Sequence, residues 1–185
     1  MDTSWRRCRF CHAPSRKQNG NAMILTKENI LNILDEVKDP EIPVISVLEL
    51  GIVRDVHVDG EKVMVDITPT YSGCPANRAI EQSIISTLRS KGFGNPTIRI
   101  VHSPPWTTDW ITKEGKRKLK EYGIAPPGSA DSEDWSPFGN LHRVVQCPFC
   151  DSEKTRLTSE FGSTACKALY YCENCQQPFE YFKCI

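Results

Sequence analysis

The nine cysteines of this 185-residue chain are the residues best suited to chemistry. Six of them form three C-x-x-C pairs, at 8 and 11, 147 and 150, and 172 and 175, while Cys74, Cys166 and Cys184 stand outside the pairs. An odd number of cysteines, in a sequence without a recognisable secretory signal, indicates thiols and metal ligands rather than disulfides. We therefore expect metal-binding chemistry in a cytoplasmic protein.

The last two pairs have the spacing of a tetrathiolate metal site. "CPFC" and "CENC" are separated by 21 residues. Each C-x-x-C turn places two thiolates on one side of a knuckle, and two knuckles complete a tetrahedral set. Zinc is the expected metal, although rubredoxin-like iron uses the same ligands. Because four thiolates leave no open coordination position, a structural role is expected for the ligands Cys147, Cys150, Cys172 and Cys175.

The segment 144–185 around these pairs is too short to bury a large core, so the metal is expected to supply folding energy. "TRLTSEF", "KALYY" and "PFEYF" predict three strands, which is the layout of a zinc ribbon. Cys166 and Cys184 are each more typical of a small buried residue than of a ligand. The alternative is that these two thiols meet in a redox or transient metal role.

Cys74 lies in "YSGCPANRAI" (71–80), where a loop runs into a helical pattern. Pro75 suits the first turn of a helix, which places Cys74 at or near the N-cap. The unpaired N–H groups and the positive end of the helix dipole would stabilise a thiolate there. A metal ligand, a nucleophile and a packed small side chain are all compatible with this position.

Two further segments carry polar groups. "DPEIP" (39–43) supplies the carboxylates of Asp39 and Glu41, which also suit simple turn chemistry. "HSPPWTTDW" (102–110) supplies His102 with two tryptophans, which are more typical of packing than of ligand binding. Nothing in the sequence brings His102 to Cys74, so an independent thiol enzyme is the least supported hypothesis.

The periodic patterns predict an α+β fold: a small α/β domain with the order helix, hairpin, helix, strand, followed by the C-terminal zinc ribbon. The first helix starts after the N-cap Thr26, "DG" at 59–60 marks the hairpin, the second helix ends near Gly92, and the third strand covers 97–102. "KEGKRKLKEYG" indicates a short surface helix. We expect a polar tail over 1–22, the α/β domain over 23–124, a Pro/Gly/Ser linker over 125–143 and the ribbon over 144–185.

Together these segments carry a resemblance. "DPEIPVISVLELGIV", "DITPTYSGCPA" and "SPPWTTDWI" resemble the SufT-like domain family of metal–sulfur cluster assembly. The C-terminal "CPFC" and "FGSTACKALYYCENCQQPFEYFKCI" narrow the resemblance to PaaD-type accessory subunits of phenylacetyl-CoA 1,2-epoxidase systems. It covers roughly residues 25–185.

The resemblance implies a non-enzymatic accessory protein of aerobic phenylacetate degradation. Such a protein would assist assembly of an iron or iron–sulfur centre in the oxygenase and reductase components of the epoxidase. Cys74 matches the family's cysteine before proline, which is proposed to handle a transient iron ion or Fe–S cluster. Asp39 and Glu41 match its acidic turn, and the four ribbon cysteines match its metal ligands.

Other hypotheses concern partners. A scaffold or interaction module without metal transfer is the main alternative, and a homodimer would bring two Cys74 thiols together. Lys and Arg number 23, as do Asp and Glu, so the formal net charge of zero disfavours nucleic acid as a partner. The absence of an apolar stretch of membrane-spanning length predicts no membrane association.

Overall fold

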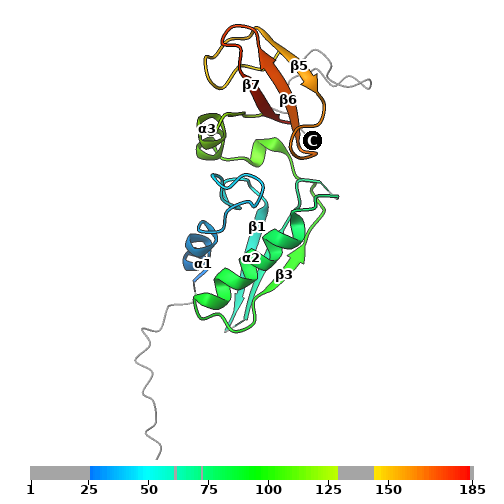
Figure 1. The fold of residues 1–185 in the computed structure, drawn as a ribbon. Helices are drawn as coiled ribbons and strands as arrows, with labels where there is room; N and C mark the ends of the chain where they lie inside the picture. The colour runs from blue at the N-terminus through cyan, green and yellow to red at the C-terminus, as the bar shows by residue number, and fades with distance from the viewer. Residues whose placement is uncertain (1–25, 61, 72, 129–143, 184–185) are drawn as a thin grey trace, which may run out of the picture.

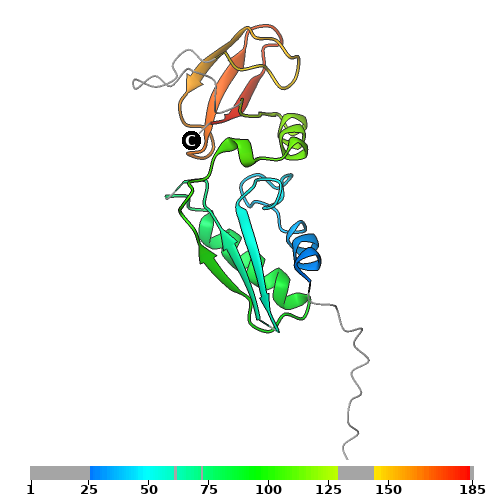
Figure 2. The ribbon, with the colours of Figure 1, turned by 180° about the vertical axis from the view of Figure 1, so that it is seen from behind.

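The computed structural model describes residues 26–60, 62–71, 73–128 and 144–183. The predicted tail, most of the predicted linker and Cys184 lie outside these residues. The described elements form two units that are stacked one above the other, with a helix between them (Figures 1 and 2). We call them the α/β unit and the ribbon.

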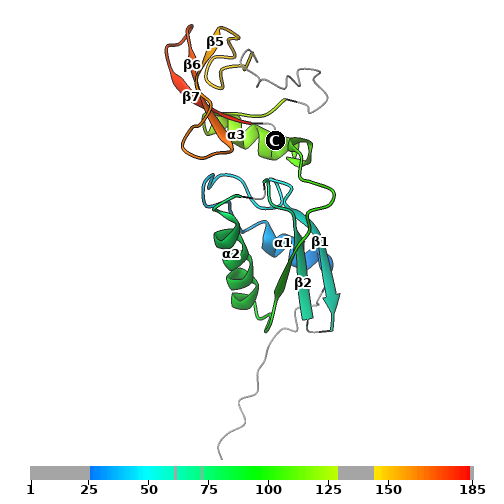
Figure 3. The same cartoon turned by 90° about the vertical axis from the view of Figure 1, so that its right-hand side faces the viewer.

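The α/β unit contains a sheet of three strands in the order β1 (Val53–Asp59), β2 (Lys62–Ile67) and β3 (Thr97–Ile100). β1 and β2 form the predicted antiparallel hairpin, whereas β3 is parallel to β2 because α2 (Asn77–Ser90) crosses between them. Helices α1 (Lys27–Leu34) and α2 cover one face of this sheet (Figure 3).

Sequence periodicity explains this unit. Val63, Val65 and Ile67 alternate along β2, and all three are buried beneath the helices. The predicted N-cap is confirmed, since the Thr26 hydroxyl accepts a hydrogen bond of 3.2 Å from the N–H of Asn29. The local signals for a cap and for alternation therefore account for α1 and β2.

The ribbon contains β5 (Thr155–Ser159), β6 (Lys167–Cys172) and β7 (Pro178–Phe182), which correspond to the three predicted strands. A short fourth strand, β4 (Ile124–Ala125), pairs in parallel with β7, and the sheet order is β4-β7-β6-β5. The polypeptide thus joins the ribbon sheet at the point where the predicted linker begins, since Ala125 belongs to β4. The predicted fold class, α+β with a C-terminal zinc ribbon, is confirmed.

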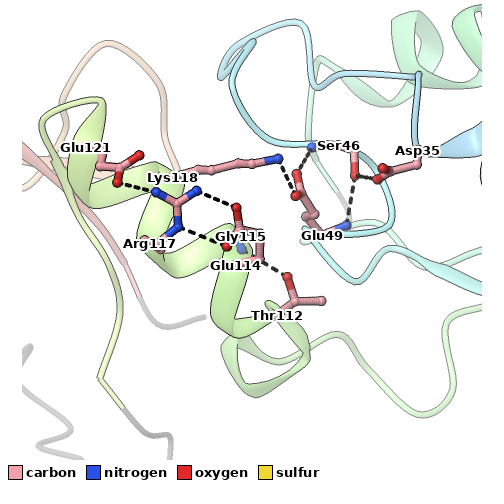
Figure 4. A network of polar contacts seen from close by, with 9 residues as sticks. All are labelled: Asp35, Ser46, Glu49, Thr112, Glu114, Gly115, Arg117, Lys118 and Glu121. Atoms are coloured by element: carbon pink, nitrogen blue, oxygen red, sulfur yellow. Dashed lines mark hydrogen bonds and ion pairs between the residues drawn. The ribbon is translucent and has the colours of Figure 1, made fainter.

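The helix between the units, α3 (Lys113–Glu121), follows the short 3-10 helix η1 (Thr108–Trp110). The sequence predicted a surface helix, and α3 does carry an exposed charged side, but Gly115 and Leu119 are buried. Lys118 forms an ion pair with Glu49 in the loop that precedes β1 (Figure 4). This helix therefore docks on the α/β unit instead of lying free in solvent.

Glu49 is the centre of that contact. It accepts a 2.9 Å hydrogen bond from the N–H of Ser46, whose hydroxyl donates to Asp35 at 2.6 Å (Figure 4). Burial raises the pKa of Glu49, but the Lys118 ammonium and the Ser46 N–H outweigh it, and the net pKa is lowered. The carboxylate form of Glu49 is therefore favoured in the folded protein.

The two tryptophans of the 102–110 segment are packing residues, as predicted. The indole N–H of Trp106 donates to the carbonyl of Leu50 at 3.1 Å, and the Trp110 ring is covered by Arg54 at 3.5 Å. Gly51 has a φ of +74°, and a Cβ at this position would lie 2.4 Å from the carbonyl oxygen of Trp110. Only glycine fits both conditions, so the backbone of this segment is held tightly against the α/β unit.

The ribbon has a hydrophobic core of its own and also packs against the α/β unit. Phe182 of β7 is only 2% exposed and belongs to the hydrophobic core of the α/β unit. Its ring lies 6.1 Å from the ring of Trp106, and Lys120 of α3 forms an ion pair with Asp151 of the ribbon.

Across the described residues, no helix has both the length and the apolar character needed to cross a bilayer.

Candidate functional site

The ribbon quartet of Cys147, Cys150, Cys172 and Cys175 is already assembled. All four sulfur atoms lie within 4.8 Å of one another, and both Cys147–Cys175 and Cys150–Cys172 are 3.6 Å apart. Tetrahedral zinc–thiolate sites have metal–sulfur distances of about 2.3 Å, which places their sulfurs about 3.8 Å apart. The spacing of the quartet therefore fits one tetrahedrally coordinated metal ion.

The knuckles around the quartet favour this geometry. Asp151 and Gln176 each follow a pair and each have a φ of +58°, which turns the backbone back toward the sulfurs. The N–H of Ser152 and the Asn174 amide lower the pKa of Cys150 to about 6. Burial and the three neighbouring sulfurs raise the pKa of Cys175 to about 12, and a bound cation would offset this rise by stabilising the thiolate.

A second site lies where the α/β unit meets the ribbon. Its cavity of about 20 Å³ is lined by the turn after α1, the loop before β1, the end of β2, and the loop before α2 together with the first turn of that helix. The ribbon contributes Cys166 and Phe182. This volume is room for roughly one water-sized group. The polar and sulfur-bearing residues in its lining include Asp39, Glu41, Thr68, Cys74 and Cys166.

Cys74 lies in a turn and not at the N-cap. Helix α2 begins at Asn77 and its N-cap is Ala76, so Cys74 lies two residues before the cap, which agrees with the predicted position at or near it. The N–H of Ala76 still bonds to the sulfur of Cys74 and lowers its pKa, but burial raises the pKa more and Glu41 adds to the rise. The predicted stabilisation of a thiolate is therefore wrong for the metal-free protein, because desolvation outweighs the helix start.

The acidic turn is built by Asp39. One oxygen of this carboxylate accepts hydrogen bonds from the N–H groups of Glu41 at 2.8 Å and Ile42 at 2.9 Å. Burial raises the pKa of Asp39, which is 7% exposed. The structure thus places both predicted carboxylates at the Cys74 cavity, with Asp39 shaping the turn that positions Glu41.

Sequence reasoning did not place Cys166 or Thr68 in this cavity, although it considered a redox or transient metal role for Cys166 together with Cys184. Cys166 comes from the ribbon, and its sulfur lies 3.9 Å from a carboxylate oxygen of Glu41. Thr68 is buried, and its hydroxyl is the one buried side-chain polar atom without a hydrogen-bond partner among the described residues. No local pattern marks either residue, because each depends on how the chain folds back.

Tyr71 shows how closely these groups gather. Burial raises the pKa of Tyr71, and the negatively charged forms of Cys74, Cys166 and Glu41 raise it further.

His102, in contrast, lines a separate hollow beside Tyr71, and it is not part of the described lining of the Cys74 cavity. The described geometry gives no support to a Cys74–His102 enzyme.

Comparison with known proteins matches both units. Residues 27–96 match the family model for "Iron-sulfur cluster assembly protein", and residues 136–183 match the "PaaD zinc beta ribbon domain". The chain is 46% identical over 153 residues to a protein of Escherichia coli (strain K12) named as a putative component of 1,2-phenylacetyl-CoA epoxidase, covering 83% of this chain and 90% of that protein. The chain belongs to the PaaD family.

Two shorter relatives of this PaaD-family chain are named as iron–sulfur maturation factors. The "Fe-S protein maturation auxiliary factor YitW" of Bacillus subtilis (strain 168) is 35% identical over 95 residues, which is 50% of this chain and 92% of the relative. The "Fe-S protein maturation auxiliary factor SufT" of Staphylococcus aureus (strain USA300) is 38% identical over 85 residues, 45% of this chain and 96% of the relative. The PaaD-family chain therefore extends well beyond the part that it shares with either factor.

Proposed function

We propose that this PaaD-family chain is a non-catalytic accessory protein of a phenylacetyl-CoA epoxidase system, acting in the cytoplasm. It holds iron or an iron–sulfur centre for a short time and passes it to the oxygenase or reductase component. The observation that carries this proposal is the cavity in which the half-buried Cys74 lies with a carboxylate turn and the hydroxyl of Thr68, which has no hydrogen-bond partner among the described residues. The names of the relatives support the same function.

The chemistry of the cavity suits a cargo that must leave again. A thiolate from Cys74 and a carboxylate from Glu41 form a mixed sulfur and oxygen ligand set, which accepts iron without the closed shell of four thiolates. Because the pKa of Cys74 is raised, the metal must displace a proton from the thiol when it binds. Return of that proton favours release of the cargo.

The ribbon quartet has a different role in this proposal. Its sulfurs fit zinc, and zinc when bound supplies folding energy for the ribbon. Cys147, Cys150, Cys172 and Cys175 would hold it as a closed shell. The ribbon in turn covers the Cys74 cavity through Cys166 and Phe182.

The direct test is metal loading of the epoxidase components. Oxygenase and reductase are co-produced with the wild-type chain, with Cys74→Ser, or without the chain, and iron and sulfide are measured in each purified component. We expect Cys74→Ser to load them no better than omission of the chain does. Loading at the wild-type level by Cys74→Ser would contradict metal transfer and leave the scaffold alternative.

Two controls make this test specific. Zinc content and the helical circular-dichroism signal of Cys74→Ser should equal those of the wild type, since Cys74 lies outside the quartet. Cys74→Asp restores an anionic ligand at the same position, and we expect it to recover part of the loading.

A further inference from the structure

The Cys74 cavity has sulfur on two of its walls, and the two sulfurs come from different units. Cys74 lies in the loop before α2, and Cys166 lies in the ribbon loop before β6. The Cys166 backbone is fixed by its carbonyl, which accepts a 2.9 Å hydrogen bond from the N–H of Lys183 just after β7. The adjacent side chain of Phe182 lines the same cavity and anchors the ribbon in the α/β core. Docking of the ribbon therefore determines where the Cys166 sulfur lies.

The side chain of Cys166 faces ligand-type groups. Its sulfur is 3.9 Å from an oxygen of Glu41 and 3.1 Å from the hydroxyl of Thr164. Cys166 is 6% exposed, so this sulfur is directed into the protein and away from bulk solvent. A buried thiol beside a carboxylate offers a soft sulfur ligand and a hard oxygen ligand at the same place. Such a mixed pair suits a divalent transition metal.

Thr68 gives independent evidence for a guest in the cavity. It is 2% exposed and lines the cavity, yet its hydroxyl has no hydrogen-bond partner among the described residues. Buried hydroxyls are almost always paired, because leaving one unpaired is unfavourable. A metal-bound water or a thiolate drawn toward a metal would supply the missing partner.

We propose that Cys166 is the second sulfur ligand of this site, so that one divalent iron ion is bound between Cys74 of the α/β unit and Cys166 of the ribbon, with Glu41 as an oxygen ligand. This inference rests on the proposed function and specifies its cargo. The cavity of about 20 Å³ has room for a single ion, whereas a cluster of several iron and sulfur atoms would require it to widen.

The binding step is an exchange of protons for a metal. Two S–H bonds are replaced by two Fe–S bonds, both protons go to solvent, and iron stays in the divalent state throughout. Among the described residues, the ribbon quartet is the one group with three or more ligand atoms already within 4.8 Å of one another. The Cys74–Cys166–Glu41 set therefore closes on the ion, and opening it again requires a smaller change than dismantling the quartet.

Cobalt(II) added to the full-length protein with a zinc-filled ribbon tests this assignment. We expect one Co²⁺ per chain, with sulfur-to-cobalt charge-transfer absorption that falls by about half in Cys166→Ser and in Cys74→Ser and vanishes in the double variant. Loss of either sulfur should weaken binding by at least about tenfold, and Thr68→Val by a smaller factor. Equal zinc content in all variants shows that the ribbon is folded.

Cobalt-edge X-ray absorption of the wild type counts the sulfurs without any substitution. We expect two sulfur scatterers at about 2.3 Å, as for other thiolate sites. One scatterer, or wild-type absorption in Cys166→Ser together with its loss in Cys74→Ser, would overturn the role of Cys166 and leave the proposed function intact. A wild type that binds no Co²⁺ beyond its zinc would overturn both.

Discussion

The two sulfur sites of this protein differ in how they are built. The ribbon quartet comes from two knuckles of one unit, and its four sulfurs lie within 4.8 Å of one another. The Cys74 site takes its groups from separate turns of both units, and burial raises the pKa of both Cys74 and Cys166. A preassembled set favours permanent binding, whereas a dispersed and protonated set favours exchange. If the proposed function holds, preorganisation, more than the number of cysteines, separates the structural site from the transfer site.

The largest effect is expected from opening the quartet. Cys172 is fully buried, and Cys172→Ser removes one of four ligands. Metal binding to zinc-finger peptides supplies an apparent free energy of about 10–16 kcal/mol, so we expect loss of zinc and unfolding of the ribbon. Zinc analysis and limited proteolysis measure both. A Cys172→Ser protein with full zinc content and an intact ribbon would remove the distinction between the sites.

The next largest effect is expected where the ribbon packs against the α/β unit. Phe182→Ala should lower the free energy of unfolding by about 3–5 kcal/mol, because it empties a core position beside Trp106. Phe161→Ala in the same ribbon is the matched control, since this side chain is 64% exposed and should change stability by less than about 0.5 kcal/mol. Urea unfolding measures both variants, and equal losses would show that the ribbon does not depend on the α/β core.

A smaller effect is expected at the α3 contact, with a defined dependence on pH. Because the pKa of Glu49 is lowered in the folded state, the stability gained from its ion pair with Lys118 is present above the unfolded pKa. It is lost as the pH falls through the lowered pKa. Glu49→Gln should lower stability by about 1 kcal/mol at neutral pH and flatten the acid limb of the stability curve.

Glu121→Gln is the control for that prediction. Glu121 pairs with Arg117 on the exposed side of α3, where ion pairs contribute about 0–1 kcal/mol (Figure 4). Thermal unfolding at several pH values measures both variants. If the two variants behave alike, the contact between α3 and the α/β unit does not stabilise the fold.

The smallest effect is expected in the reactivity of Cys74. Since burial and then Glu41 raise its pKa, alkylation by iodoacetamide should be slow near pH 7 and should accelerate as the pH rises above the ordinary thiol range. Glu41→Gln removes a negative charge, lowers the pKa and should speed the reaction at neutral pH. Mass spectrometry of the Cys74 peptide measures the rate. A Cys74 more reactive than free cysteine at pH 7 would indicate a stabilised thiolate and contradict the contrast between the two sulfur sites.

The features that were predicted correctly depend on residues that lie close together along the sequence. The Thr26 cap, the Asp59–Gly60 hairpin and the spacing of the C-x-x-C pairs are local signals, and each was sufficient for its element. The predicted direction of the Cys74 pKa shift was wrong. The helix start that lowers the pKa is visible in the local sequence, whereas the burial that raises it more comes from distant segments. A transient metal role for Cys166 was considered only together with Cys184. Its position beside Glu41 had no local signal, since it follows from ribbon docking. The pairing of β4 with β7 is similar, because a strand of two residues leaves no periodic pattern.

The ribbon quartet is expected to keep its metal, whereas the Cys74 site is expected to exchange its metal. A chelator challenge tests this difference directly: the wild type is loaded with zinc and then with ferrous iron under anaerobic conditions, a chelator is added, and the departure of both metals is followed. We predict that iron leaves rapidly while zinc stays, and that Cys74→Ser shows a smaller and faster iron phase with an unchanged zinc phase. Iron that leaves Cys74→Ser as it leaves the wild type, or zinc that departs together with iron, would contradict the account.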